Sequence, residues 1–175
     1  MQTESDVKGE IDMRKILSIV LALTMLLLFC ACGNRPDMPF NGLVKFHDME
    51  LTVPDRFVRD STQSNDGMWI FESDWYTEYI IITAQTSSLA ETDPQKQLTE
   101  YAELMRSRNA ESNIVPFLEG SGVLSTYYFD DKYCQEIFFC HGNEVYAMAL
   151  RGGTEEAFNE IASSIKMTAE DTASE

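Results

Sequence analysis

Short apolar stretches separated by polar turn residues dominate the chain from residue 43 to residue 84, a pattern that predicts β-strands joined by hairpins. His47 and Asp48 fill the first turn, and Pro54 ends the second strand because proline has no N–H for a ladder hydrogen bond. The expected strands are Leu43 to Phe46, Met49 to Val53, Phe57 to Val58, Met68 to Phe71 and Tyr79 to Ala84.

Two later stretches follow the helical period of 3.6 residues. The first begins at Pro94 behind the capping residue Asp93, and the second follows Gly152 and Gly153 and is capped by Thr154. The two apolar stripes are Leu98, Tyr101, Ala102 and Met105, and Phe158, Ile161, Ala162 and Ile165. Each stripe predicts a helix that packs on a sheet.

Three further strands are expected between the two helices, at Val123 to Phe129, Tyr133 to Cys140 and Val145 to Leu150. Short turns join them, so they should form an antiparallel meander. The order of hairpins, helix, meander and helix predicts an α+β fold with an antiparallel sheet of about six to eight strands and two packed helices.

Three features resemble the Mog1/PsbP-like fold. They are the early hairpin in FHDMELTVPDRF, the mid-chain helix, and the closing segments GNEVYAMAL and TEEAFNEIASSIK. The resemblance covers most of residues 40–167 and implies a sandwich of sheet and helices. Proteins of this fold bind partners as accessory subunits, so the resemblance also implies a binding role by analogy.

The segment MRKILSIVLALTMLLLFCACG, from Met13, has the layout of a secretory signal. Arg14 and Lys15 supply the basic start, and an apolar run follows. That run is about 16 residues, or roughly 24 Å as a helix, which is short for a bilayer core of about 30 Å. We interpret residues 1–31 as the signal region, with Met13 as its natural start because residues 1–12 are polar and acidic.

The end of this segment resembles a bacterial lipobox, in which a small residue precedes a cysteine that receives lipid before cleavage. Cys32 follows the small Ala31, whereas Cys30 follows the bulky Phe29. The resemblance therefore implies that Cys32 is the lipidated residue, although Phe29 stands where the pattern usually has leucine. An uncleaved membrane anchor and a plain signal cut elsewhere are the alternatives.

The remaining boundaries follow from composition. Residues 32–39 contain two prolines and read as a lipidated tether, residues 40–167 form a single α+β domain, and residues 168–175 form a disordered acidic tail. The chain has 13 basic and 29 acidic residues, a formal net charge of −16. Such a charge repels phosphates, so we expect no nucleic-acid partner.

Few residues suggest catalysis. His47 and His141 fall in predicted hairpin turns, with Asp48 and Glu50 beside the first and Glu144 near the second, and exposed turn histidines are the expectation. Cys134 and Cys140 lie six residues apart on one strand, roughly 20 Å, too far for a disulfide. They are expected to be buried free thiols. We expect no metal and no cofactor.

The segment MWIFESDWYTEY, residues 68–79, interleaves aromatic rings with carboxylates. Such a combination suits a sugar, a cationic ligand or a protein partner, since rings stack and attract cations. The candidate contact residues are Asp74, Trp75, Tyr76 and Glu78. The alternative is that Trp69 and Phe71 belong to the core while Trp75 and Tyr76 cover a hairpin turn.

Together these features predict a lipid-anchored, extracytoplasmic binding or accessory module, held on the outer face of the bacterial cell membrane by acylated Cys32. Its partner would be an envelope protein or a small ligand, and the domain should be monomeric. The alternatives are an envelope structural or adhesion protein, and a hydrolase that uses acidic residues.

Overall fold

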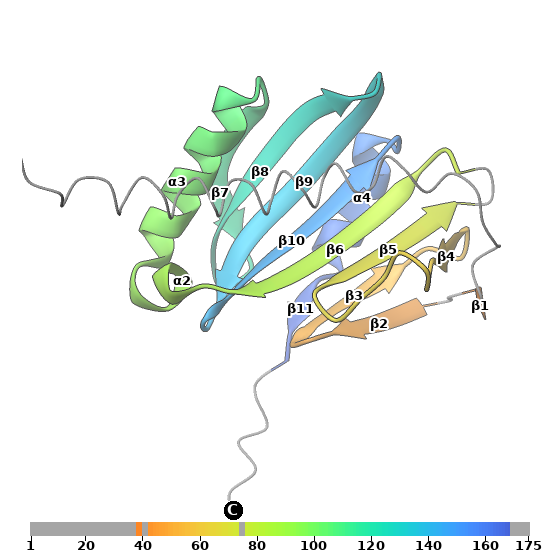
Figure 1. Ribbon diagram of the computed structural model, residues 1–175, viewed down its shortest axis with the longest axis horizontal. Helices are drawn as coiled ribbons and strands as arrows, with labels where there is room; N and C mark the ends of the chain where they lie inside the picture. The colour runs from red at the N-terminus through yellow and green to blue at the C-terminus, as the bar shows by residue number, and fades with distance from the viewer. Residues whose placement is uncertain (1–37, 40–41, 74–75, 169–175) are drawn as a thin grey trace, which may run out of the picture. The chain divides into compact units, whose positions relative to one another are not determined.

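The computed structural model describes residues 38–39, 42–73 and 76–168 (Figure 1). All of them belong to one compact unit, Pro36–Glu175. The predicted signal region, Cys32 and nearly all of the acidic tail lie outside the described residues, so the predictions for them stay predictions.

An eight-stranded antiparallel sheet forms the framework, with the strand order β1-β4-β5-β6-β10-β9-β8-β7. Its two edge strands each contain a proline, Pro39 in β1 and Pro116 in β7. The strands are β1 (Met38–Pro39), β4 (Phe57–Arg59), β5 (Met68–Ser73), β6 (Tyr79–Thr86), β7 (Glu111–Phe117), β8 (Gly120–Phe129), β9 (Lys132–His141) and β10 (Glu144–Arg151).

A second, three-stranded sheet has the order β11-β3-β2. It consists of β2 (Gly42–Phe46), β3 (Met49–Val53) and β11 (Lys166–Met167). His47 turns the β2–β3 hairpin with a φ of 52°, the left-handed region that few residues other than glycine adopt. The last described strand therefore returns to pair with the first hairpin.

Three helices pack on these sheets: α2 (Ser88–Thr92), α3 (Pro94–Ser107) and α4 (Glu155–Ser163). Asp93 caps α3 by accepting a hydrogen bond from the Lys96 amide at 3.0 Å. Thr154 caps α4 in the same way, through the Ala157 amide at 3.2 Å. Among the described residues, no helix has both the length and the apolar character needed to cross a membrane.

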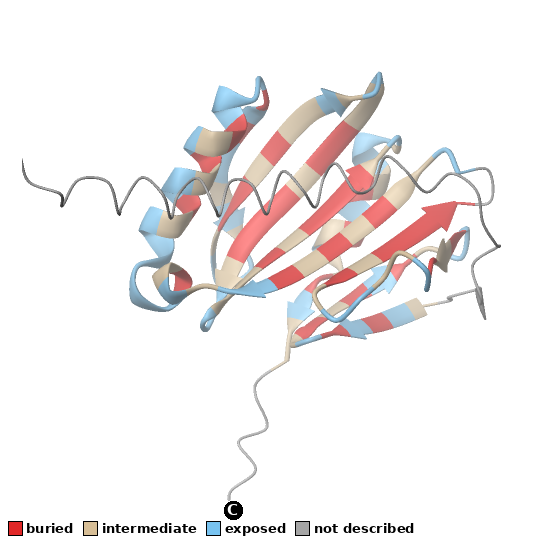
Figure 2. Cartoon of the chain, in the orientation of Figure 1, coloured by how far each residue is buried: buried red, intermediate tan, exposed pale blue. Residues whose placement is uncertain are grey.

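Two apolar cores lie on opposite faces of the large sheet. The larger core joins one face to the small sheet and to α4, and includes Phe46, Phe139 and Ile161. The smaller core lies under α3 and contains Leu98, Ala102, Val123 and Phe138. Buried and partly exposed positions alternate along β6 because successive side chains point to opposite faces, whereas β9 has buried positions on both faces (Figure 2).

The predicted α+β class and the antiparallel sheet with packed helices are confirmed. Every strand and both helices expected from the sequence are present. The structure adds the short helix α2, the edge strands β1 and β7, and β11. It also assigns the first hairpin to the small sheet, which covers the large one.

Candidate functional site

A polar residue interrupts the inward side of β9. Gln135 has the same orientation in the strand as Ile137 and Phe139, which belong to the larger core. The Gln135 side chain is only 5% exposed, and its Oε1 atom is buried without a hydrogen-bond partner. An unsatisfied buried acceptor costs about 1–3 kcal/mol, so this amide calls for an explanation.

Gln135 lines an open pocket of about 230 Å³ at one end of the sheet. Gln135 pairs in register with Thr126 of β8, which in turn pairs with Glu111 of β7, so these three residues form one row across the strands. The first turn of α4 closes the pocket with Glu155. The other lining residues are Asn113, Leu124 and Tyr133.

The pocket is acidic and has one aromatic wall. Neither Glu111 nor Glu155 has an ion-pair partner among the described residues, and no basic residue lines the pocket. Tyr133 packs against Tyr128 with ring centroids 5.7 Å apart, and Tyr128 is 74% exposed. Hydrogen-bond acceptors, negative charge and an exposed ring therefore converge at this place.

The aromatic and acidic segment that the sequence singled out lies elsewhere, in β5, the β5–β6 turn and the first residue of β6. Asp74 and Trp75 lie outside the described residues. Tyr76 is 48% exposed, and Glu78 forms an ion pair with Arg56 at 2.9 Å. Trp69 packs edge-on against Phe46 in the larger core, as in the alternative reading of this segment.

Neighbouring turns hold this segment in place. Lys132 Nζ donates hydrogen bonds to the Tyr76 and Thr77 carbonyl oxygens, at 3.3 and 3.0 Å. Gly152, with a φ of 80°, passes so close that a Cβ atom there would lie 2.2 Å from the Thr77 oxygen. The described part of the turn is thus contacted by Lys132 at the start of β9 and by Gly152 in the segment before α4.

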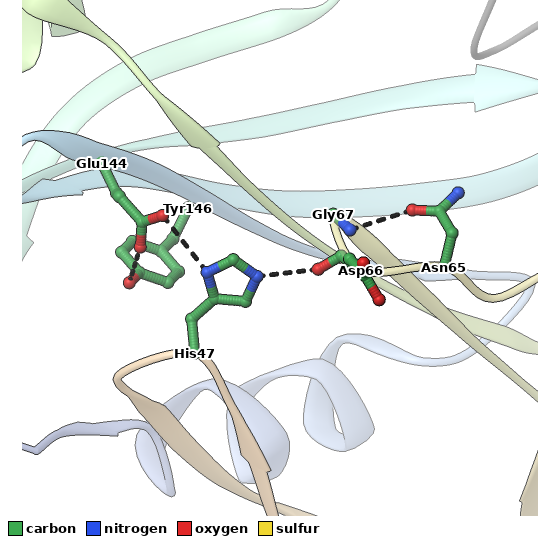
Figure 3. A network of polar contacts seen from close by, with 6 residues as sticks. All are labelled: His47, Asn65, Asp66, Gly67, Glu144 and Tyr146. Atoms are coloured by element: carbon green, nitrogen blue, oxygen red, sulfur yellow. Dashed lines mark hydrogen bonds and ion pairs between the residues drawn. The ribbon is translucent and has the colours of Figure 1, made fainter.

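His47 contacts a carboxylate that the sequence placed near the other histidine (Figure 3). Its Nδ1 lies 3.2 Å from Glu144 Oε1, and its Nε2 donates to the Asp66 carbonyl at 2.7 Å. The Tyr146 hydroxyl donates to the other Glu144 oxygen. The Asp66 hydrogen bond, followed by the nearby Glu144 charge, raises the pKa of His47 above its usual value, against the opposing effect of desolvation.

His47 therefore joins the hairpin of the small sheet to β10 and to the β4–β5 loop, a role that links elements of the fold. His141 is the last residue of β9 and is exposed. His47 lies in a turn, as the sequence predicts, whereas His141 ends β9 just before its turn; the partners of His47 come from distant parts of the chain.

Cys134 and Cys140 are free thiols on one side of β9. Cys134 is buried and Cys140 is half-buried. Burial raises the pKa of each thiol to about 11, so both are protonated near neutral pH and are weak nucleophiles.

A second polar residue of β9, Glu136, lies on the face that α3 covers. The Tyr101 hydroxyl of α3 donates to one carboxylate oxygen, and the Tyr127 hydroxyl lies 3.4 Å from the other. The Tyr101 ring stacks on Phe138 with centroids 3.8 Å apart. Desolvation raises the pKa of Glu136, while the two tyrosine hydrogen bonds act in the opposite direction.

Besides Glu111 and Glu155 in the pocket, a second pair of carboxyl groups bears on the hydrolase alternative, Asp60 and Glu72. Both are buried, at 5% and 6% exposed, and Gln63 donates to each, at 2.6 and 3.4 Å. Desolvation raises the pKa of Glu72; for Asp60, hydrogen bonds from Thr62 and Gln63 overcome desolvation and lower it. The pair is occupied by these internal hydrogen bonds.

Comparison with solved structures places this arrangement in a known fold. A crystal structure from Bacteroides thetaiotaomicron is 13% identical, with a TM-score of 0.54 over 76% of this chain and 50% of that one. The solution structure of cyanobacterial PsbP (CyanoP) from Synechocystis sp. PCC 6803 is 10% identical, with a TM-score of 0.50 over 77% of this chain and 98% of that one. The fold is PsbP-like.

At these identities the likeness concerns the fold alone. The chain described here spans about half the length of the Bacteroides protein that it matches. No protein-family model matches the sequence. No curated protein matches it.

The pocket was not predicted from the sequence, because its lining residues come from four separate elements. One signal pointed to it. Gln135 is a polar residue at a position whose strand neighbours of the same orientation, Ile137 and Phe139, are apolar and buried.

Proposed function

We propose that this chain is a lipid-anchored, extracytoplasmic binding or accessory module of the bacterial cell envelope. The observation that supports binding is the open pocket that Gln135 lines together with polar residues of β7, β8 and α4. The pocket is open and lined by polar side chains, and the exposed Tyr128 ring, which packs against the half-buried Tyr133 ring, suits a contact surface beside it.

The proposed location depends on the sequence of the N-terminal segment. A basic start, an apolar run and Cys32 behind the small Ala31 are the features of a lipoprotein signal. An acylated cysteine carries more than one lipid chain, enough for stable anchoring. The PsbP-like fold agrees with the accessory role that the sequence resemblance implies.

A non-enzymatic role agrees with the state of the titratable groups in the described residues. The thiols have raised pKa values, and Asp60 and Glu72 share internal hydrogen bonds. An envelope structural or adhesion protein remains the first alternative, and a hydrolase is the second.

Lipid labelling tests the anchor. Cys32→Ser should abolish incorporation of labelled fatty acid and leave a larger, unprocessed precursor. Cys30→Ser is the matched control and should be processed and labelled normally. Lipid labelling that persists without Cys32 would overturn the proposed anchor.

Site-specific photo-crosslinking in native membranes tests the binding role. A photoreactive phenylalanine derivative in place of Tyr128 should form a discrete adduct, because this ring lies exposed beside the pocket. The same group in place of the exposed Glu103 of α3 is the control, and in place of Trp75 it tests the β5–β6 turn. A pattern identical at Tyr128 and Glu103, or no adduct at either Tyr128 or Trp75, would contradict the binding role.

A further inference from the structure

The outer strand of the small sheet has an open edge. Among the described strands, β2 pairs with β3 alone, at one side of the order β11-β3-β2 (Figure 1). We propose that this edge binds an extended, acidic segment of a partner protein, which adds to the small sheet as a further strand. The edge shares no residue with the pocket beside β9, so the inference goes beyond the function proposed for that pocket.

The backbone of β2 offers hydrogen-bonding groups at this edge. The hairpin loop between β2 and β3 has two residues, so Phe46 and Met49, which flank it, form a hydrogen-bonded pair. Such pairs alternate along an antiparallel ladder, and the N–H and C=O groups of Leu43 and Lys45 therefore point away from β3. Both residues are exposed, Leu43 by 63%, whereas Val44 between them is fully buried. An added strand would find two donors and two acceptors here.

The other sheet edges are poorly suited to such an addition. β1 and β7, at the edges of the large sheet, each contain a proline, which removes a backbone donor. β11, at the opposite edge of the small sheet, has only two residues. β2 has five residues and no proline. Among the described strands, β2 is therefore the edge with both the length and the donors for strand addition.

The outward side chains of β2 indicate the chemistry of the added strand. Lys45 is exposed and forms no ion pair with a described residue. A lysine on an edge strand disfavours a basic neighbour, whereas a carboxylate directly opposite it compensates its charge. Leu43 lies on the same face, two residues away, and suits an apolar side chain opposite it. The segment that fits has an acidic and an apolar residue two positions apart.

A second copy of the chain fits this edge less well. Symmetric antiparallel pairing of two β2 strands about Val44 uses all five residues and places Lys45 opposite Leu43 of the other copy. Pairing centred on Leu43 or on Lys45 uses fewer residues, and the latter places two lysines opposite each other, where like charges repel. No such register gives Lys45 a countercharge, and an acidic segment does.

NMR titration of the isotope-labelled full chain in non-ionic detergent tests the inference. The probe is the synthetic peptide acetyl-STEVVTS-amide, whose glutamate and second valine lie opposite Lys45 and Leu43 in an antiparallel arrangement. Saturable binding should shift the amide signals of these two residues and leave the pocket residues Glu111 and Gln135 unchanged. The same peptide, methylated on the backbone nitrogens of its glutamate and second valine, should not bind, because it lacks the donors that face β2.

Charge variants test the pairing opposite Lys45. Lys45→Glu should weaken binding of this peptide about fivefold, because attraction between the two charges becomes repulsion, and should strengthen binding of a peptide with lysine in place of glutamate. Lys166→Glu, at the other edge of the small sheet, is the matched control and should change neither, since Lys166 is also exposed. Thermal melts check that both variants stay folded.

The inference is overturned by the absence of a saturable shift at Leu43 and Lys45, by equal binding of the methylated peptide, or by an equal response of the two lysine variants. Shifts of the same amides that grow with protein concentration, without peptide, would assign the edge to a second copy and overturn it too. The Tyr128 crosslink does not involve β2. A Tyr128 adduct without peptide binding would therefore remove only the edge of β2 and leave the proposed function.

Discussion

Gln135 and Glu136 are consecutive residues of β9 that face opposite sides of the large sheet. They differ in whether their side-chain oxygens have hydrogen-bond partners. Glu136, on the side of α3, is bound by the Tyr101 and Tyr127 hydroxyls. Gln135, on the side of α4, is more deeply buried and has an oxygen without a partner. Both are polar residues in a strand whose other central positions are apolar.

The difference follows from what covers each face. Helix α3 packs on β7, β8 and β9 and brings Tyr101 directly over Glu136. Helix α4 packs on β3, β9 and β10, and the pocket opens beside its first turn. A polar residue at a core position therefore marks a structural network on one face and a candidate binding site on the other, and only its neighbours distinguish the two.

The largest effect is expected from removing the ring that covers Glu136. Tyr101→Ala should lower the free energy of unfolding by about 3 kcal/mol, because it removes the stacking on Phe138 as well as the hydroxyl donor. Tyr101→Phe keeps the ring and should cost about 1–3 kcal/mol. Urea unfolding measures both. Equal stability of the two variants would show that the hydroxyl alone matters.

The next effect concerns pH. The pKa of Glu136 is raised in the folded state, so its contribution to stability is complete below its ordinary value of 4.5 and is lost as the pH rises through the folded value. Glu136→Gln still accepts tyrosine hydrogen bonds but does not titrate. Unfolding midpoints across mildly acidic to neutral pH should therefore fall less steeply in this variant. An unchanged pH profile would contradict the assignment.

A smaller change of opposite sign is expected on the other face. Gln135→Leu replaces an unsatisfied amide by an apolar side chain of similar size, and should raise the free energy of unfolding by about 1 kcal/mol. Thermal melts of the full chain measure it. A clear loss of stability would mean that the amide has a structural role like that of Glu136, and the contrast between the two faces would disappear.

The smallest effect on the free energy of unfolding should come from His47, which belongs neither to the Glu136 network nor to the pocket at Gln135. Its raised pKa means that its contribution to stability is present below its ordinary value of 6.5 and is lost as the pH rises through the folded value. His47→Gln should remove this dependence above pH 6.5 and leave the Glu136 profile unchanged. Unfolding measured on both sides of neutrality checks the two expectations together.

Local patterns were enough to predict most of the fold. The stripe at Leu98, Ala102 and Met105 and the cap at Asp93 gave α3, because helix periodicity and capping are set within a few residues. The edge strand β7 was missed because its segment, ESNIVPF, includes Pro116 and few buried residues. It becomes a strand by pairing with β8, a partner that its own composition does not indicate.

The candidate site shows the same limit more strongly. The sequence drew attention to residues 68–79, where rings and carboxylates are adjacent in the chain, but Glu78 pairs with Arg56 and Trp69 packs in the core. The pocket instead assembles residues from β7, β8, β9 and α4. Side chains that meet only through strand register and helix docking leave no contiguous signal.

The prolines of the two edge strands have a consequence for crowding. A protein held on a membrane as proposed diffuses in two dimensions, where copies meet often and an open sheet edge could recruit the edge of a neighbour. Pro39 in β1 and Pro116 in β7 each remove a backbone donor from the edges where such an extended intermolecular sheet would start. The missing donors therefore disfavour edge-to-edge pairing of the large sheet with a neighbouring copy.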